Sequence, residues 1–187
     1  MSRLGNLKLF RSVKSWAIYL IVFFCMAKGI SYVLMIGYVP SSSMENTMQI
    51  GEAFAGINIW FLDNLHRGDI VDFYPNKEEQ DKADGYWVKR IIGIPGDKVK
   101  IEEGIIYING KKQKEAYVDK PISYNNTFTV PEGKYFVCGD NRAESWDARR
   151  WVNPFVGRDQ IKYKVLFRIY PFNKIGGIYD KKSVSDE

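Results

Sequence analysis

The hydrophobic positions divide the chain into one long apolar run and a series of short, strand-like segments. The run, "SWAIYLIVFFCMAKGISYVLMIGYV", covers residues 15–39 and contains one charged residue, Lys28. A helix of about 20 residues spans a bilayer, so the run is long enough to cross one. Four basic residues and no acidic residue lie between positions 3 and 14. Such a basic flank predicts a cytoplasmic N-terminus and a C-terminal domain on the outer side of the membrane.

Two features bear on this anchor. A lysine at mid-membrane costs about 3 kcal/mol, and Lys28 avoids that cost only by snorkelling toward the outer face. A cleavable signal peptide is the alternative, because residues 16–27 form a hydrophobic core that small residues follow. We predict a retained anchor. The predicted divisions are a basic cytoplasmic segment at 1–14, a transmembrane anchor at 15–36, a folded domain at 37–180 and a flexible tail at 181–187.

Beyond a serine-rich stretch, the pattern becomes typical of β structure. "DIVDFYP" (69–75) has a strand composition and ends at a proline, and "GKYFVCGDN" (133–141) is typical of a strand that runs into a turn. Residues 86–112 contain three short strands, and Pro-Gly-Asp at 95–97 separates the first two. Asn-Gly at 109–110 predicts a two-residue hairpin after the third.

The last strand-like segment, "IKYKVLFRIYP" (161–171), alternates apolar with basic residues and predicts a half-buried strand. Its apolar face is expected to carry Ile161, Tyr163, Val165, Phe167 and Ile169. Many short strands with turn signals predict a mostly β chain. The expected fold is a compact antiparallel β-domain with a small insert at about 103–132, preceded by one transmembrane helix as the only long helix.

Composition narrows the classes of function. The 187 residues suffice for one domain with its own core, and the formal net charge is +5 with scattered lysines. Nucleic-acid binding would need a denser basic stripe, whereas a mildly basic surface fits an anionic lipid bilayer. His66 is the only histidine, and Cys25 and Cys138 lack zinc-ligand spacing. We therefore expect no metal, no cofactor and no nucleic-acid partner.

The serine-rich stretch "VPSSSMENTM" (39–48) is either an ordinary polar linker or the place of a nucleophile. A nucleophilic serine needs a base. His66 lies in "DNLHRGD", among charged loop residues, and a surface position explains it better. A neutral lysine is the other known base for serine.

Lys89, in "GYWVKRIIGIPGD", is the candidate lysine. On a strand, Lys89 shares a face with Trp87 and Ile91, and apolar neighbours lower the pKa of a lysine by reducing its hydration. A base near neutral pH needs a pKa of about 7 or 8 rather than about 10.4. The alternative is that Lys89 snorkels from the edge of a strand.

A third cluster, "GDNRAESWDARRW" (139–151), begins with the turn signature Gly-Asp-Asn and contains Ser145. Paired carboxylates could serve acid–base chemistry or metal binding. However, each acid of the cluster has an arginine within two residues, which favours structural ion pairs within the loop. The charged members are Asp140, Arg142, Asp147, Arg149 and Arg150.

Together these segments resemble the type I signal peptidases, in the compact single-anchor bacterial form. A hydrophobic N-terminal segment, "PSSSM", "VKRIIGIPGD", "GDNRAESWDAR" and "VLFRIYPFNKIG" occur in the family's order, from about residue 10 to 178. The resemblance implies a β-domain of the signal-peptidase type and a serine protease with a Ser-Lys dyad. It makes Ser43 the nucleophile, Lys89 the general base, Ser41 the oxyanion donor and Ser145 the residue that orients the lysine, with Asp147 and Arg149 as the structural ion pair of the site loop.

The resemblance also implies the substrates, which are signal peptides of exported pre-proteins, cut after small residues at the outer face of the cell membrane. Residues 36–44 and 84–90 are expected to form walls that bind the substrate as an added strand. One departure stands out, because Asn46 occupies the position where the family usually has proline.

Two rival interpretations remain. A related Ser-Lys protease could cut itself or one dedicated partner, such as a pilin or a conjugation protein. A non-enzymatic membrane-tethered domain could bind proteins or cell wall, and its function would survive alanine at Ser43 and Lys89.

Overall fold

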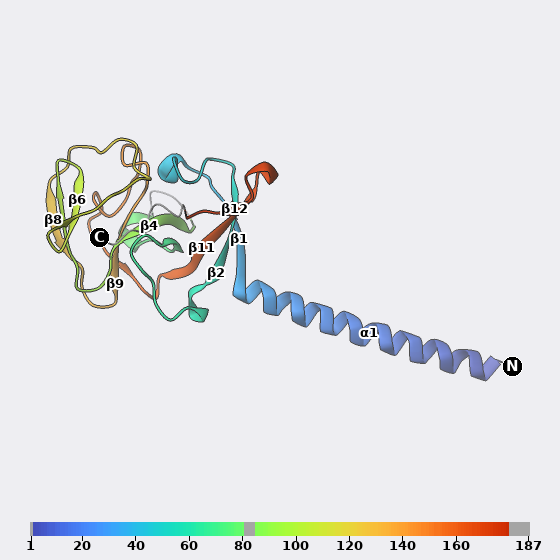
Figure 1. Cartoon of the computed structure of the whole chain (residues 1–187). Coiled ribbons are helices and arrows are strands. Elements are labelled where there is room, and N and C mark those ends of the chain that lie inside the picture. The colour runs from blue at the N-terminus through green and yellow to red at the C-terminus, as the bar shows by residue number, and fades with distance from the viewer. Residues whose placement is uncertain (1, 81–84, 180–187) are drawn as a thin grey trace. The chain divides into compact units, whose positions relative to one another are not determined.

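The computed structural model describes residues 2–80 and 85–179. It divides into two compact units, Met1–Leu34 and Met35–Glu187, which are considered separately (Figure 1). The predicted tail at 181–187 and residues 81–84 lie outside the described residues.

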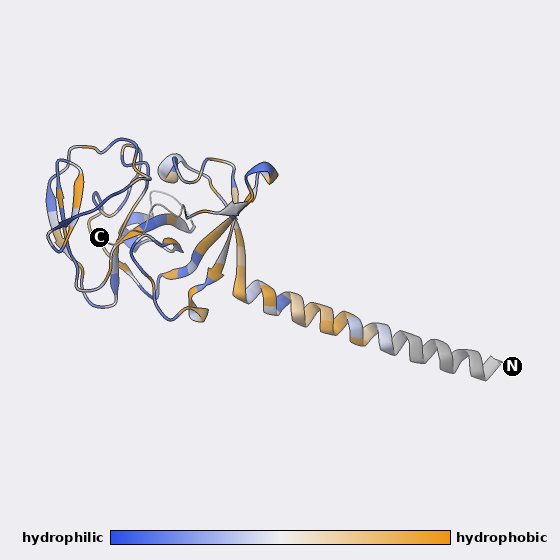
Figure 2. Ribbon diagram, viewed as in Figure 1, coloured by the Kyte–Doolittle hydropathy of each residue, from blue (hydrophilic) through white to orange (hydrophobic). Residues whose placement is uncertain are grey.

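The N-terminal unit is one helix, α1 (Ser2–Val33). Its portion Ser15–Val33 has 19 residues, a mean hydropathy of 1.7 and no burial within the protein. Figure 2 shows this portion as mostly hydrophobic. By length and composition it can cross a membrane, as predicted, although a signal sequence has the same properties.

An antiparallel sheet of eight strands forms most of the second unit. Its strands lie in the order β1 (Leu34–Tyr38), β2 (Ala53–Asn58), β11 (Ile161–Tyr170), β3 (Ile70–Phe73), β4 (Trp87–Gly93), β9 (Lys134–Cys138) and β10 (Val156–Gly157), with β12 (Gly176–Gly177) beside β11. The mostly β fold class is therefore confirmed. Short helical turns are η1 (Ser42–Met44), η2 (Ile59–Phe61), α2 (Lys77–Gln80) and η3 (Phe172–Lys174).

A second, four-stranded sheet has the order β7 (Lys111–Lys112), β6 (Ile105–Ile108), β5 (Lys98–Glu102) and β8 (Asn126–Thr129). The predicted hairpin joins β6 to β7: Asn109 and Gly110 have φ of 52° and 85°, the left-handed values that this two-residue turn requires. The segment from 98 to 129 thus folds as a sheet of its own.

The core has two buried clusters. The larger includes Val71, Phe73 and Ile91 and extends into the second sheet, while the smaller gathers Met44, Met48, Phe54 and Ile70. Strand β3 is buried on both faces, because its side chains enter both clusters. This explains why its apolar residues do not alternate with exposed polar ones, although Asp72 interrupts them.

One expectation for β11 is wrong. Phe167 is 54% exposed rather than part of a continuous buried face with Val165. The pairing of β11 with β2 shifts register between Val165 and Phe167 and again between Arg168 and Tyr170. A bulge adds one residue to a strand and reverses the faces that follow, so simple alternation fails there.

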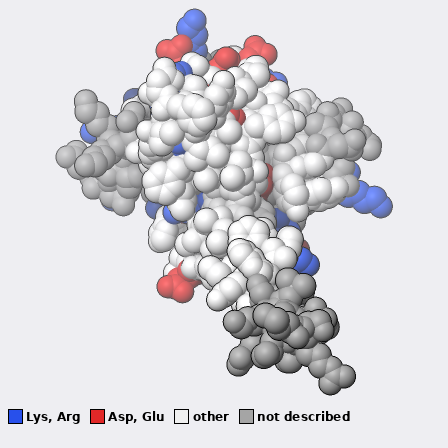
Figure 3. Space-filling model, turned by 90° about the vertical axis from the view of Figure 1, so that its right-hand side faces the viewer, with Lys and Arg blue, Asp and Glu red and all other residues white. Residues whose placement is uncertain are grey.

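Charged side chains are sparse over the middle of the face shown in Figure 3 and are scattered toward its margins. Large apolar side chains such as Trp60, Phe172 and Ile175 are exposed in the second unit. The face in view therefore shows mainly uncharged side chains rather than a dense basic stripe.

Candidate active site

The serine-rich stretch forms a fixed helical turn rather than a loose linker. Ser41 is extended, and η1 begins at Ser42. Met44 and Met48 are buried in the smaller core cluster and anchor the turn to the core. Ser43 therefore stands on a short turn that is anchored by two apolar side chains.

The loop after β9 holds the backbone of this turn. Asn141 donates its amide N–H to the Ser43 carbonyl and its side-chain Nδ2 to the Ser42 carbonyl, both at 3.1 Å. At Gly139, an added Cβ would lie 2.4 Å from the Ser43 carbonyl oxygen and 2.2 Å from the Ser145 Oγ. Only glycine allows so close an approach, so Gly139 is what brings Ser145 and the serine turn together.

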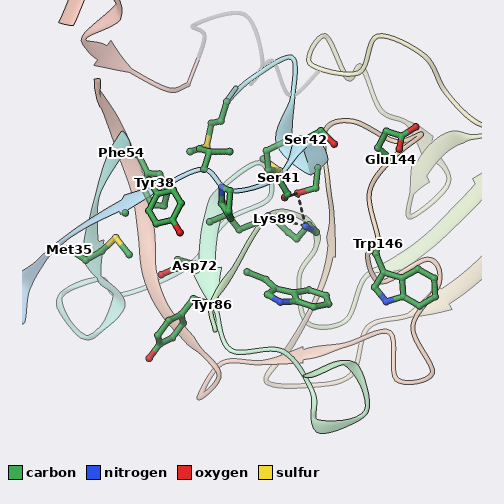
Figure 4. Close-up of a pocket in the computed structure, with 18 of the residues that line it drawn as sticks. Met35, Tyr38, Ser41, Ser42, Phe54, Asp72, Tyr86, Lys89, Glu144 and Trp146 are labelled. Atoms are coloured by element: carbon green, nitrogen blue, oxygen red, sulfur yellow. Dashed lines mark hydrogen bonds between the residues drawn. The ribbon is translucent and has the colours of Figure 1, made fainter. Parts of the chain in front are cut away.

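Lys89 reaches Ser43 from β4. Its Nζ donates to the Ser43 Oγ at 2.9 Å and to the Val88 carbonyl at 3.3 Å (Figure 4). The indole of Trp87 lies 5.7 Å from the Nζ. The lysine is only 5% exposed, and no carboxylate lies within ion-pair distance of it among the described residues. The strand-edge alternative, in which the amine reaches bulk water, does not describe this position.

Burial lowers the pKa of Lys89 to about 8, because the charged amine loses hydration. The negative charges of Asp147 and Asp140 oppose this shift, and the Arg149 charge adds to it. At mildly alkaline pH a large share of the molecules therefore carries a neutral amine. A neutral amine can accept the proton of a serine hydroxyl.

The two other predicted serines, Ser41 and Ser145, differ in their burial and in their distance from the Ser43–Lys89 pair. The Ser41 Oγ lies 3.3 Å from the Ser43 Oγ, on the exposed side. Ser145 is fully buried beside Asp147, and its hydroxyl helps to lower the pKa of that carboxyl group. The structure therefore brings Ser145 next to Gly139 but gives no direct bond from it to Lys89.

Ion pairs hold the site loop, and only one of the two pairs described next lies inside the loop. Asp147 pairs with Arg149 at 2.8 Å. Although burial alone would raise the pKa of Asp147, hydrogen bonds and charge from Arg149 and the Gly139 amide hold it below its usual range. The expectation that Asp140 pairs inside the loop is wrong, because its partner is Arg90 on β4, at 2.6 Å.

Arg142 also pairs outside the loop, with Glu115 at 2.6 Å. Sequence reasoning missed Glu115, which lies in a polar stretch without a motif. It also missed Asn141, although its position in the Gly-Asp-Asn turn was a usable signal. In both cases the contact joins segments far apart in the chain.

Asn46 adopts a conformation that proline cannot. Its φ is 85°, whereas proline is fixed near −65°. The Asn46 Nδ2 donates to the Tyr117 carbonyl at 3.4 Å. The residue that departs from the family pattern therefore adopts a backbone conformation closed to proline. Its side chain also connects the turn to Tyr117.

A cavity of about 720 Å³ opens beside the dyad. Two segments, residues 35–44 and 86–89, form much of its lining, which also includes Met48, Phe54, Asp72, Glu144 and Trp146. Figure 4 shows Ser41 and Lys89 close together, one from each segment. Of the predicted walls, residues 36–44 and 86–89 line the cavity. Gly85 and Arg90 do not line it, and residue 84 lies outside the described residues.

Other candidates for chemistry lie elsewhere. The side chain of His66 is 73% exposed beside Asp69 and is absent from the cavity lining. Within the described parts of the chain, no group of three or more His, Cys, Asp or Glu residues could hold a metal ion. The Ser43–Lys89 pair is suited to serine chemistry with lysine as the base, because the amine lies within hydrogen-bond distance of the hydroxyl.

Comparisons with known proteins identify relatives of the chain. Residues 10–170 match the family described as "Signal peptidase, peptidase S26". A probable signal peptidase I-2 of Synechocystis is 37% identical over 161 residues, covering 83% of this chain and 72% of the relative. Signal peptidase IB of Staphylococcus aureus is 32% identical over 186 residues, covering 88% of this chain and 93% of the relative.

A solved signal peptidase I from Enterococcus faecalis is 32% identical, covers 55% of this chain and 97% of its own, and superposes with a TM-score of 0.43. That score is too low to bear on the fold. The family match and the identity to the two relatives are sufficient: the chain belongs to the signal peptidase family, peptidase S26. It is a serine endopeptidase of the signal peptidase I type.

Proposed function

We propose that this protein removes signal peptides from exported pre-proteins by acyl transfer, with Ser43 as the nucleophile and Lys89 as the general base. One observation carries the proposal: a buried lysine with a lowered pKa lies 2.9 Å from a serine hydroxyl at the wall of a cavity. Both geometry and proton affinity fit the transfer of the Ser43 proton to Lys89.

In the proposed reaction, Lys89 takes the hydroxyl proton as the Ser43 Oγ attacks the scissile carbonyl. The protonated amine then gives a proton to the leaving amine, and the acyl group stays on Ser43. A water molecule, activated by Lys89, releases the acyl group and restores the enzyme. Lys89 therefore carries each proton of both steps, which requires the amine to be neutral at the start.

The oxyanion needs donors aimed at the developing charge. The Ser43 amide lies in the first turn of η1, where helical N–H groups lack partners within the helix. The Ser41 hydroxyl lies on the exposed side of the nucleophile. We assign these two groups to the oxyanion, and Ser145 to orienting the protonated amine through its buried hydroxyl, which lies close to Gly139 and the serine turn.

The proposal includes a membrane location. The apolar helix Ser15–Val33 supports an anchor, and the basic residues between positions 3 and 14 support a cytoplasmic N-terminus. The catalytic unit would then act on the outer side, beside the bilayer that holds the hydrophobic part of the substrate. Protease added to intact spheroplasts should digest this unit, and digestion only after lysis would contradict the orientation.

Cleavage of a labelled pre-protein with an Ala-x-Ala site, in detergent, tests the function. Wild type should cut at the site, and Ser43→Ala and Lys89→Ala should not. Ser42→Ala is the matched control, because the Ser42 hydroxyl has no hydrogen bond among the described residues, and it should remain active. Cleavage of only one pre-protein from a broad panel would indicate a dedicated protease. A folded but inert wild type would favour a binding domain.

A further inference from the structure

Asp72, on β3, is a buried carboxyl group that the proposed mechanism does not use. It lies within the apolar sequence "IVDF" and is only 2% exposed. Its Oδ2 is buried and has no hydrogen-bond partner, and no ion pair involves Asp72 among the described residues. A buried, unpaired carboxylate is costly, so its presence calls for an explanation.

The same carboxyl group lines the cavity beside the dyad. In the view of Figure 4 it lies between Tyr38 and Tyr86, while Trp146 and Glu144 lie at the other end. Apart from Asp72, this part of the lining is apolar or aromatic, with Met35 and Phe54 nearby (Figure 4). A substrate segment in the cavity would therefore bring its side chains against one polar group in an otherwise apolar wall.

The dyad does not supply the missing partner. Antiparallel pairing sets Asp72 opposite Val88 and sets Lys89 opposite Val71. Paired residues point to the same face, so Asp72 and Lys89 leave the two strands on opposite faces. Burial alone raises the pKa of Asp72, to about 7, without a contribution from Lys89. The carboxyl group is therefore available to a group from outside the described fold.

We propose that Asp72 is a specificity-determining residue, which selects substrates that place a cationic, hydrogen-bond-donating side chain in this part of the cavity. The inference rests on the proposed function, because it assigns a preference to the same site. A lysine or arginine of the substrate would supply both the hydrogen bond and the opposite charge that Asp72 lacks. An apolar substrate side chain would leave the Asp72 carboxylate desolvated and without a partner. An acidic side chain would add repulsion between two negative charges.

A positional scan tests the proposal with the full-length enzyme in detergent. Labelled pre-proteins carry lysine, methionine or glutamate in turn at each position flanking the scissile bond, with the Ala-x-Ala residues otherwise kept. The readout is the ratio of kcat/KM values at each position. Wild type should prefer lysine over methionine at one position, by about tenfold or more, and should disfavour glutamate there.

Asp72→Asn should abolish the lysine preference at that position, and Asp72→Val should reverse it in favour of methionine. Glu132→Gln is the control for net charge, because Glu132 is exposed and lies outside the cavity lining; it should keep the preference. Asn is nearly isosteric with Asp, and removing an unpaired buried charge should not lower the unfolding temperature of the variant.

The outcomes separate this inference from the proposed function. If wild type cuts no member of the panel, the proposed function fails. If wild type cuts the panel but no position prefers lysine, the assignment to Asp72 is wrong while the function stands. The assignment is equally wrong if the preference survives Asp72→Asn, or if it disappears only in Glu144→Gln, at the other end of the cavity.

Discussion

Among the described residues, buried charges form ion pairs in one region of the catalytic unit and are unpaired in another. Beneath the site, the ion pairs Arg90–Asp140, Arg142–Glu115 and Asp147–Arg149 connect β4, the loop after β9 and the segment before β8. At the cavity wall, Lys89 and Asp72 are as deeply buried but have no ion-pair partner among the described residues.

The paired charges support the fold, whereas the unpaired charges are suited to chemistry or substrate binding. A paired buried charge fixes the positions of the chain segments it joins. Pairing holds the pKa of Asp147 below its usual range and that of Arg149 above it. A lone buried charge loses hydration without compensation, so its pKa moves toward neutrality, to about 8 for Lys89 and about 7 for Asp72. Unpaired groups of this kind are the ones that exchange protons or meet a substrate.

The largest effect is expected at the lone lysine. Lys89→Arg keeps the positive charge but cannot lose its proton near neutral pH, so activity should fall by about 10³-fold or more. Steady-state cleavage of the Ala-x-Ala pre-protein measures this. An active Lys89→Arg enzyme would show that proton transfer does not pass through this side chain.

Among the paired charges, Asp140→Ala should cost about 3–5 kcal/mol of unfolding free energy, because it leaves Arg90 buried without its partner. Urea unfolding of the detergent-solubilised protein measures the change. Glu102→Ala is the matched control: its pair with Lys100 is about half exposed and should contribute less than about 1 kcal/mol. Equal effects in the two variants would remove the distinction drawn between buried and exposed pairs.

A smaller catalytic effect is expected at Ser41. Loss of one oxyanion donor typically lowers kcat by about 10²-fold or more, so Ser41→Ala should lower kcat with little change in KM. Ser41→Thr keeps a hydroxyl and should restore part of the rate. A change confined to KM would instead assign Ser41 to substrate binding.

The smallest effect concerns stability. The folded-state pKa of Lys89 lies below its unfolded value, so burial of the charged amine destabilises the fold below about pH 8. This penalty is relieved as the pH rises toward the unfolded pKa. Lys89→Met should therefore raise the unfolding free energy at pH 7, by about 1–3 kcal/mol, and by less at pH 10. A variant less stable than wild type at pH 7 would contradict the absence of a partner.

The sequence was sufficient for the strands with strong local signals and for the candidate dyad. The Asn-Gly hairpin needed only two neighbouring residues, and Ser43 and Lys89 followed from motifs whose order resembles a known family. The lowered pKa of Lys89 also followed from apolar neighbours on its strand.

Contacts between distant segments could not be predicted in this way. Arg90 and Asp140 are adjacent only because β4 pairs with β9, and Glu115 reaches Arg142 from a stretch without a motif. The bulges of β11 reversed the faces that alternation assigned. Asp72 did leave a signal, since an acid within a buried apolar strand is rare, but its place in the cavity depends on the folded sheet.

The pH dependence of kcat/KM for the wild-type enzyme tests the central claim most directly. If Lys89 is the base, the rate should rise about tenfold per pH unit on the acid side and level off above about pH 8, the pKa of the buried amine. The His66→Ala enzyme should give the same curve. A rate that is independent of pH across this range, or an acid limb that moves in His66→Ala, would contradict the assignment of Lys89.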